Sequence, residues 1–246
     1  MASELWPNDE LTQLANRYFS DKGTSYNCAH GYTRVYSALF SPVRTASVRL
    51  LEIGLVHGQV QAMNPQDIPN LGCPSLRMWA DFLPNADIHG MDIVDFTHLS
   101  TDRLKVWQAD QGDRQALESL AKTIGGRFDI IIDDGSHASH QQQISLSTLF
   151  KHLADGGLYV IEDLHFQPGE LEIQGITKTR DFLHGLGGRH RGMRIALDQA
   201  EFAYLISQIH SIRFFDSISS RWPLSATADA LAVIQKKGTH PFLAGI

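Results

Sequence analysis

Short runs of apolar, β-branched residues alternate along this chain with longer stretches in which apolar residues recur every three or four positions. The run at 128–133, Phe-Asp-Ile-Ile-Ile-Asp, is the most hydrophobic, and two glycines introduce the run at 158–163. Runs of this kind are typical of buried strands, and the stretches between them are typical of helices that cover a sheet. We therefore predict seven strands, at 48–53, 86–93, 103–110, 128–133, 158–163, 212–218 and 230–235.

The stretches between the strands carry the helical period. In one of them Leu117 and Leu120 lie three positions apart and Ala121 follows one turn after Leu117, so one face is apolar. Strands that alternate with helices predict parallel βαβ units with helices on both faces of the sheet. The last two strands are joined by only about ten residues, too few for a crossover, so this pair is predicted to be antiparallel. Helices are expected at 75–82, 113–124, 139–153 and 198–210.

The chain length of 246 residues predicts one large domain, 1–246. Residues 1–45 precede the first strand, and Leu11, Leu14 and Tyr18 have helical spacing there, which predicts a helical cover. The connection at 164–194 is rich in glycine. Loops of that length in compact domains are usually lids or binding loops.

Composition narrows the class of protein. There are 21 Lys and Arg against 27 Asp and Glu, a net charge of −6, which gives no overall footprint for nucleic acid or for an anionic membrane. Two cysteines are too few for a disulfide framework or a Cys-rich zinc site. Since the start lacks the pattern of a signal peptide and no long apolar run follows, we expect a cytoplasmic protein without a membrane segment.

Acidic residues end almost every predicted strand. A single carboxylate in such a position can be explained as a helix N-cap. Five strands that all end this way at one rim are harder to explain by capping, because a desolvated charge is costly unless it is paired or coordinated. The set indicates a ligand site at the carboxyl ends of the strands and consists of Glu52, Asp92, Asp110, Asp133, Asp134, Glu162 and Asp163.

The first strand leads from Glu52 into a turn with glycines at Gly54 and Gly58. Glycine allows a positive φ or a close approach of the backbone to a ligand, and a purely structural role explains the turn equally well. The spacing is not the G-x-G-x-x-G pattern of dinucleotide sites. The acidic residue that ends the second strand, Asp92, lies well beyond the separation of about 20 residues expected for such a site.

Asp92 has the chemistry to bind a ribose diol, and the pair Asp110-Gln111 follows the third strand, where it could face an adenine. Together with the glycine turn these residues predict a nucleoside site without a pyrophosphate. S-adenosylmethionine fits that description better than NAD.

The fourth and fifth predicted strands are neighbours, so Asp134, Glu162 and Asp163 are expected to converge. Carboxylates packed together repel one another unless protons or a cation intervene. Oxygen ligands without cysteine favour Mg²⁺, with Mn²⁺ or Ca²⁺ as alternatives. His137 follows Asp134 by three residues on the same loop, within reach of a metal-bound substrate.

Several motifs occur in one order between about residues 20 and 165. They are Ser20-Asp-Lys-Gly-Thr, His30-Gly-Tyr-Thr, Tyr36, Glu52-Ile-Gly54, Ser75-Leu-Arg-Met-Trp79, Gly90-Met-Asp92-Ile93, Ala109-Asp-Gln-Gly-Asp113, Ile132-Asp-Asp-Gly-Ser-His137 and Tyr159-Val-Ile-Glu-Asp163. Together they resemble the metal-dependent class I S-adenosylmethionine O-methyltransferases of antibiotic biosynthesis, of the macrolide-sugar (mycinamicin VI) type. Cephalosporin-hydroxylase-like proteins share the later motifs.

The resemblance implies an α/β, Rossmann-like, seven-stranded and mostly parallel sheet with an antiparallel edge strand. It also implies S-adenosylmethionine, Mg²⁺ and a homo-oligomer whose N-terminal segments help close the site. It implies that Asp134, Glu162 and Asp163 bind the metal, and that His137 acts as the general base with Asp134 beside it. The expected cofactor residues are Glu52, Gly54, Gly58, Asp92, Ile93, Asp110, Gln111 and Asp133.

Three features depart from the family. Val56 stands where many methyltransferases have a middle glycine, the chain is shorter than the macrolide-sugar enzymes, and no family motif follows about residue 164. The region 164–194 is therefore expected to be a lid or an acceptor-binding insertion, and the acceptor itself stays open.

The predicted reaction is methyl transfer to a sugar hydroxyl of an antibiotic-like glycoside, with His137 as the base. One alternative acceptor is a catechol or another vicinal diol on an aromatic product. A second alternative is a cephalosporin-hydroxylase-like protein that binds S-adenosylmethionine without catalysis. Methylation of nucleic acid is disfavoured by the net charge. The only features that encourage it are Lys178, Arg180, Arg189, Arg191 and Arg194, which are more simply a solvated face.

Overall fold

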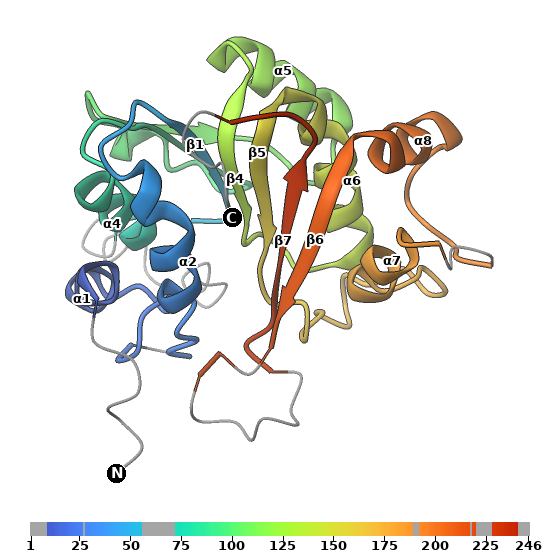
Figure 1. Cartoon of the computed structure of the whole chain (residues 1–246), viewed down its shortest axis with the longest axis horizontal. Helices are drawn as coiled ribbons and strands as arrows, with labels where there is room; N and C mark the ends of the chain where they lie inside the picture. The colour runs from blue at the N-terminus through green and yellow to red at the C-terminus, as the bar shows by residue number, and fades with distance from the viewer. Residues whose placement is uncertain are drawn as a thin grey trace.

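The structure is a computed structural model and describes residues 9–26, 28–55, 72–188, 192–216, 218–219 and 228–240. In this part of the chain seven strands form one sheet in the order β3-β2-β1-β4-β5-β7-β6 (Figure 1). Strands β1 to β5 are parallel, and β7 is antiparallel to both of its neighbours. The strands are β1 (Arg49–Ile53), β2 (Asp87–Asp92), β3 (Leu104–Gln108), β4 (Phe128–Asp133), β5 (Leu153–Ile161), β6 (Ile209–Phe215) and β7 (Leu231–Lys236).

The predicted fold class is confirmed, including the antiparallel pairing of the last two strands. The antiparallel strand β7 lies one position in from the edge, between β5 and β6. Burial explains this order: β7 is buried along almost all of its length, whereas β6 is half-buried and suits an edge. Strand β5 begins at Leu153, five residues earlier than predicted, because Leu153 pairs with Phe128 ahead of an irregularity in the ladder.

Helices cover both faces of the sheet, as the alternation within β4 requires. Ile130 and Ile132 pack with α1, α2 and α4, whereas Phe128 and Ile131 pack with the group that contains α5 and α6. Figure 1 shows α1, α2 and α4 together on one side and α6, α7 and α8 on the other. The helices are α1 (Glu10–Tyr18), α2 (Thr33–Phe40), α4 (Pro74–Phe82), α5 (Arg114–Ile124), α6 (Ser139–Leu149), α7 (Thr179–Gly185) and α8 (Gln199–Gln208), with 3₁₀ turns at Ser41–Val43, Thr97–Leu99 and Phe150–His152.

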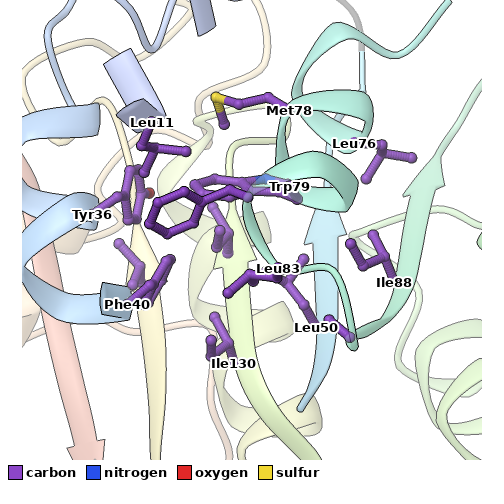
Figure 2. Close-up of a cluster of buried hydrophobic side chains, with 14 of the residues drawn as sticks. Leu11, Tyr36, Phe40, Leu50, Leu76, Met78, Trp79, Leu83, Ile88 and Ile130 are labelled. Atoms are coloured by element: carbon purple, nitrogen blue, oxygen red, sulfur yellow. The ribbon is translucent and has the colours of Figure 1, made fainter. Parts of the chain in front are cut away.

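Trp79 of α4 is the centre of the first face. Its ring meets Tyr36 at 5.2 Å and Phe40 at 5.7 Å between centroids, both edge to face, and Leu11 packs beside them (Figure 2). Aromatic pairs in this arrangement add about 0.5–1.5 kcal/mol each beyond their buried area. Helices α1 and α2 lie within the segment for which a helical cover is predicted, and the aromatic cluster holds them against the sheet.

Helix α6 is buried on all sides, because the chain after β5 packs across it. The Gln143 side chain joins the two, donating to the Thr177 carbonyl at 2.7 Å and accepting from the Ala196 amide at 2.9 Å. The region predicted as a loop at 164–194 includes helix α7, which sequence periodicity did not indicate because it is only seven residues long. Among the described residues, none of the helices has the length and apolar character needed to cross a bilayer.

Candidate active site

The carboxyl ends of β1, β4 and β5 bring the acidic residues of these strands to one edge. The ladder continues into the loops, since the Asp134 amide donates to the Ile53 carbonyl at 2.9 Å and the Glu162 amide donates to the Asp133 carbonyl at 2.9 Å. Backbone pairing therefore places Asp134 and Glu162 side by side on rigid strand ends rather than on free loops.

Lys22 lies in the middle of this acidic edge. Its ammonium group is 2.9 Å from Glu162 Oε2 and 3.3 Å from Glu52 Oε1, and it also pairs with Asp134 Oδ2. Only 1% of the Lys22 side chain is exposed. Burial opposes the charge, but Asp134 and Glu162 outweigh it and raise the pKa of Lys22 well above its ordinary value. Lys22 is therefore a buried, permanently charged partner of three carboxyl groups.

Two tyrosines of the N-terminal segment complete the surroundings of the β5 end. The Tyr36 hydroxyl donates to Glu162 Oε1, and the Tyr32 hydroxyl donates to Asp163 Oδ1 at 2.5 Å. Glu162 therefore has one oxygen on Tyr36 and the other on Lys22. Burial and the neighbouring Asp134 raise the pKa of Glu162 well above its usual range.

His137 reaches the same edge from the loop after β4. Its Nε2 lies 3.6 Å from Asp163 Oδ2, and Asp134, His137 and Asp163 each offer a ligand atom within 4.8 Å of the others. His137 has a φ of 60°, an uncommon conformation for a residue with a side chain. Its Nδ1 is buried and has no hydrogen-bond partner among the described residues. Burial opposes ionisation of Asp163, but His137, His30 and the Tyr32 bond together lower the pKa of its carboxyl group.

This edge suits a divalent cation. Three carboxyl groups pair with Lys22, and the fourth, Asp163, lies beside Asp134 and His137, so one lysine accompanies four acidic groups at this edge. Of the three predicted ligands, the structure groups Asp134 and Asp163 with His137 and turns Glu162 towards Lys22 and Tyr36. Carboxylate oxygens are the donors that Mg²⁺ and Mn²⁺ prefer.

The predicted cofactor residues fall into two groups, and the first lies around the end of β1. Asp92 accepts from the Leu55 amide and from the Val94 amide, each at 2.9 Å, and so holds the two turns together. Gly54 has a φ of 83°, and a Cβ there would lie 2.0 Å from the Asp134 carbonyl oxygen, so this glycine is required by packing. Gly58 lies outside the described residues.

The second group joins the ends of β3 and β4 to α6. Gln111 donates to Asp133 Oδ1 at 2.6 Å, and the Ser145 hydroxyl donates to Asp133 Oδ2 at 2.5 Å. Burial raises the pKa of Asp133 to about 6, and in the same way burial raises the pKa of Glu52 to about 7. Asp133 and Gln111 therefore bond to each other. The exposed members of the predicted set are Ile93 and Asp110.

Sequence reasoning assigned no role to Lys22, Tyr32 or Tyr36, although all three lie in the upstream segment that carried the family resemblance. It also missed the contact between His30 Nδ1 and Asp229 Oδ1, at 2.6 Å. The one available signal for Lys22 was a lysine next to Asp21 in a segment of otherwise small residues. Which strand end it meets could not be read without the fold.

No protein-family model matches the sequence. The chain is 41% identical over 155 residues to mycinamicin VI 2''-O-methyltransferase of Micromonospora griseorubida, and 40% identical over 155 residues to demethylmacrocin O-methyltransferase of Streptomyces fradiae. It is 40% identical over 154 residues to 8-demethyl-8-alpha-L-rhamnosyl tetracenomycin-C 2'-O-methyltransferase of Streptomyces olivaceus. Each alignment covers 63% of this chain. Over about 155 residues, this chain is therefore similar to sugar O-methyltransferases of antibiotic pathways.

The solved structures agree with that similarity. MycE methyltransferase from the mycinamycin biosynthetic pathway, in complex with Mg, SAH and mycinamycin VI, superposes with a TM-score of 0.70 at 28% identity. The match covers 96% of this chain and 58% of that chain. This chain therefore has the class I methyltransferase fold. The chain spans only 36–37% of the length of the curated relatives named above.

Proposed function

We propose that this protein is an S-adenosylmethionine-dependent and Mg²⁺-dependent O-methyltransferase that acts on a sugar hydroxyl of an antibiotic-like glycoside. The observation that carries the proposal is the group of Asp134, His137 and Asp163 at the ends of β4 and β5. It occurs in a chain about 40% identical to sugar O-methyltransferases over more than 150 residues.

The cofactor is proposed to bind at the carboxyl ends of β1 to β4, where open α/β sheets bind ligands. Exposed Ile93 and Asp110 would contact the adenine side, and Asp92 would bind the ribose. The remaining predicted residues would support the site from beneath. Trp79 holds Glu52, and Gly54 packs against Asp134. Ser145 bonds to both Gln111 and Asp133. Gly58 is proposed on its sequence position alone.

A sugar hydroxyl is a poor nucleophile because it stays protonated at neutral pH. The imidazole of His137 is proposed to take that proton while the oxygen bonds to the methyl carbon and the carbon–sulfur bond breaks with its electron pair on sulfur. Asp163, 3.6 Å from the ring, would stabilise the imidazolium that results. General-base catalysis of this kind typically contributes about 10²–10⁴-fold.

Asp134 and Asp163 are the residues proposed to hold the metal, with Glu162 joined to them through Lys22 or bound directly. When bound, the cation supplies positive charge that orients the acceptor and stabilises alkoxide character. Lys22 keeps the remaining carboxyl groups of the cluster in place, and Tyr32 fixes one oxygen of Asp163 so that the other faces His137.

Transfer of a labelled methyl group from S-adenosylmethionine tests the proposal. The acceptors are mycinamicin VI, on which one relative acts, and a catechol. Methylation of the glycoside that stops in EDTA and returns with Mg²⁺ is the expected result. Methylation of the catechol alone would replace the sugar acceptor with the aromatic one, and full activity in EDTA would remove the metal from the proposal. A homo-oligomer and a cytoplasmic location stay predictions.

A further inference from the structure

Helix α6 begins two residues after His137 without a cap of its own. The N-cap residue is Ala138, which has no side-chain acceptor, and the first turn contains no acidic residue. The first amides of a helix have no partner within the helix, and here the Gln142 amide is the first to find one, the Ala138 carbonyl at 2.9 Å. The start of α6 therefore needs an acceptor from elsewhere.

Glu172, in the chain after β5, provides that acceptor. Its Oε1 accepts from the Ser139 amide at 2.6 Å, and its Oε2 accepts from Lys178 Nζ at 2.9 Å. The carboxylate thus lies at the positive end of α6, where a negative charge is favourable. Burial opposes ionisation, but Lys178 and Ser139 outweigh it and lower the pKa of Glu172.

The loop that carries His137 is held from both sides. On the strand side the Ser136 amide donates to Gln111 Oε1 at 2.9 Å, and on the helix side Glu172 binds the Ser139 amide. Between these two points His137 keeps its uncommon φ of 60°. Such a conformation persists only where the surroundings determine it.

We propose that Glu172 is a positioning residue that fixes His137 by capping α6 across 33 residues of sequence. The proposal rests on the proposed function, because it assigns Glu172 to the placement of the general base. The 164–194 segment contacts the base directly as well, since it places Phe166 edge-on against the His137 ring, with 6.1 Å between centroids. Docking of this segment and placement of the base are therefore coupled.

Three variants and one control test the proposal. Glu172→Ala removes the acceptor, Glu172→Asp keeps the charge but shortens its reach, and Glu172→Gln keeps an acceptor oxygen without the charge. Glu170→Ala is the matched control, since Glu170 is an exposed glutamate two residues away in the same segment. Hydrogen exchange at the Ser139 amide, kcat for methyl transfer, and the Kd for S-adenosylhomocysteine are measured for each.

In Glu172→Ala and Glu172→Asp we expect Ser139 exchange to quicken about tenfold and kcat to fall about tenfold, while Kd changes less than about twofold. Glu172→Gln and Glu170→Ala should behave like the wild type. Unchanged exchange and kcat in Glu172→Asp would overturn the proposal, and this variant decides alone if Glu172→Ala does not fold. It would also be overturned if Kd weakened as much as kcat fell, because that marks a purely structural role.

A wild-type protein that binds S-adenosylhomocysteine but transfers no methyl group would count against the proposed function and against a positioned base. The exchange measurement needs no acceptor. If the wild type is active and hydrogen exchange at the Ser139 amide is unchanged in Glu172→Ala, the capping role of Glu172 is overturned while the proposed function stands.

Discussion

The ammonium group of Lys22 lies 2.9 Å from Glu162 Oε2, although 140 residues separate the two along the chain. This contact joins the N-terminal segment to the end of β5, and Tyr36 reinforces it by donating to the other oxygen of Glu162. Residues Lys22 and Tyr36, which precede the first strand, therefore contribute directly to the acidic edge, because Lys22 supplies a positive charge to its carboxyl groups.

The first prediction follows from that charge. Lys22→Met removes one partner of a buried ionic cluster and leaves the carboxyl groups uncompensated. The free energy of unfolding, measured in EDTA, should therefore fall by about 3–5 kcal/mol. Lys178→Met is the control, because the Lys178 side chain is 46% exposed and an ion pair of a solvent-exposed lysine is worth about 0–1 kcal/mol. Denaturant titration measures both. Equal, small losses would show that Lys22 does not hold the cluster together.

Gly54→Ala is predicted to be among the most destabilising small substitutions in the chain. The added Cβ would lie 2.0 Å from the Asp134 carbonyl oxygen, at a φ of 83° that alanine disfavours. We expect a loss of more than about 3 kcal/mol. In Gly169→Ala nothing lies within 4 Å of the new Cβ, so its stability should stay within about 0.5 kcal/mol of the wild type. A small loss of stability in Gly54→Ala would show that the turn at Gly54 does not lie against the Asp134 carbonyl oxygen as described.

The buried carboxyl group of Asp133 should make the stability of the ligand-free protein depend on pH. Burial raises its folded pKa from 3.8 to about 6, so the folded state binds the proton more tightly than the unfolded state. The stabilising contribution is complete below pH 3.8 and lost as pH rises to about 6, a change of about 3 kcal/mol. The free energy of unfolding of Asp133→Asn should not show this loss between pH 3.8 and about 6.

The control has the opposite sign. Arg180 lowers the pKa of Asp216, so the stability that this pair contributes is present above the ordinary pKa and is lost as the pH falls. Urea titrations of Asp133→Asn and Asp216→Asn from pH 4 to 7 measure the two differences, and the difference for Asp216→Asn should stay nearly constant in this range because Asp216 titrates below pH 3.8. If wild type and Asp133→Asn kept a constant difference across this range, the buried carboxyl group would not titrate as described.

His137→Ala should lower kcat by about 10²–10⁴-fold and leave the Kd for S-adenosylhomocysteine unchanged. His140→Ala, a histidine one turn away in α6, provides the comparison and should retain most of the activity. Steady-state kinetics with saturating Mg²⁺ measure both. Near-normal turnover in His137→Ala would assign the base to another group.

Local patterns predicted most of the fold because apolar runs and helical periods follow directly from burial. The strand ends at Asp92, Asp133 and Ile161 fall within two residues of the predicted ones. Helix α7 escaped prediction because a seven-residue helix has too few turns to show a period. The start of β5 escaped it because only pairing with Phe128 makes Leu153 a strand residue.

The site was predictable to the extent that parallel strands bring their carboxyl ends together, which placed Asp134 beside Glu162 and Asp163. The partners of these carboxyl groups were not predictable, because Lys22 and Tyr32 belong to a segment whose path depends on packing against Trp79. Glu172 was hidden for the same reason, since it caps a helix that lies far from it in sequence.

Calorimetric titration of the wild-type protein with S-adenosylhomocysteine is the most direct test of a cofactor site at this edge of the sheet. We expect saturable binding at one site per chain, and we expect Asp92→Ala to weaken it at least tenfold because the residue proposed to bind the ribose is gone. No binding by a folded wild-type protein would rule out the proposed methyl transfer, since every step proposed at His137 depends on a cofactor held there.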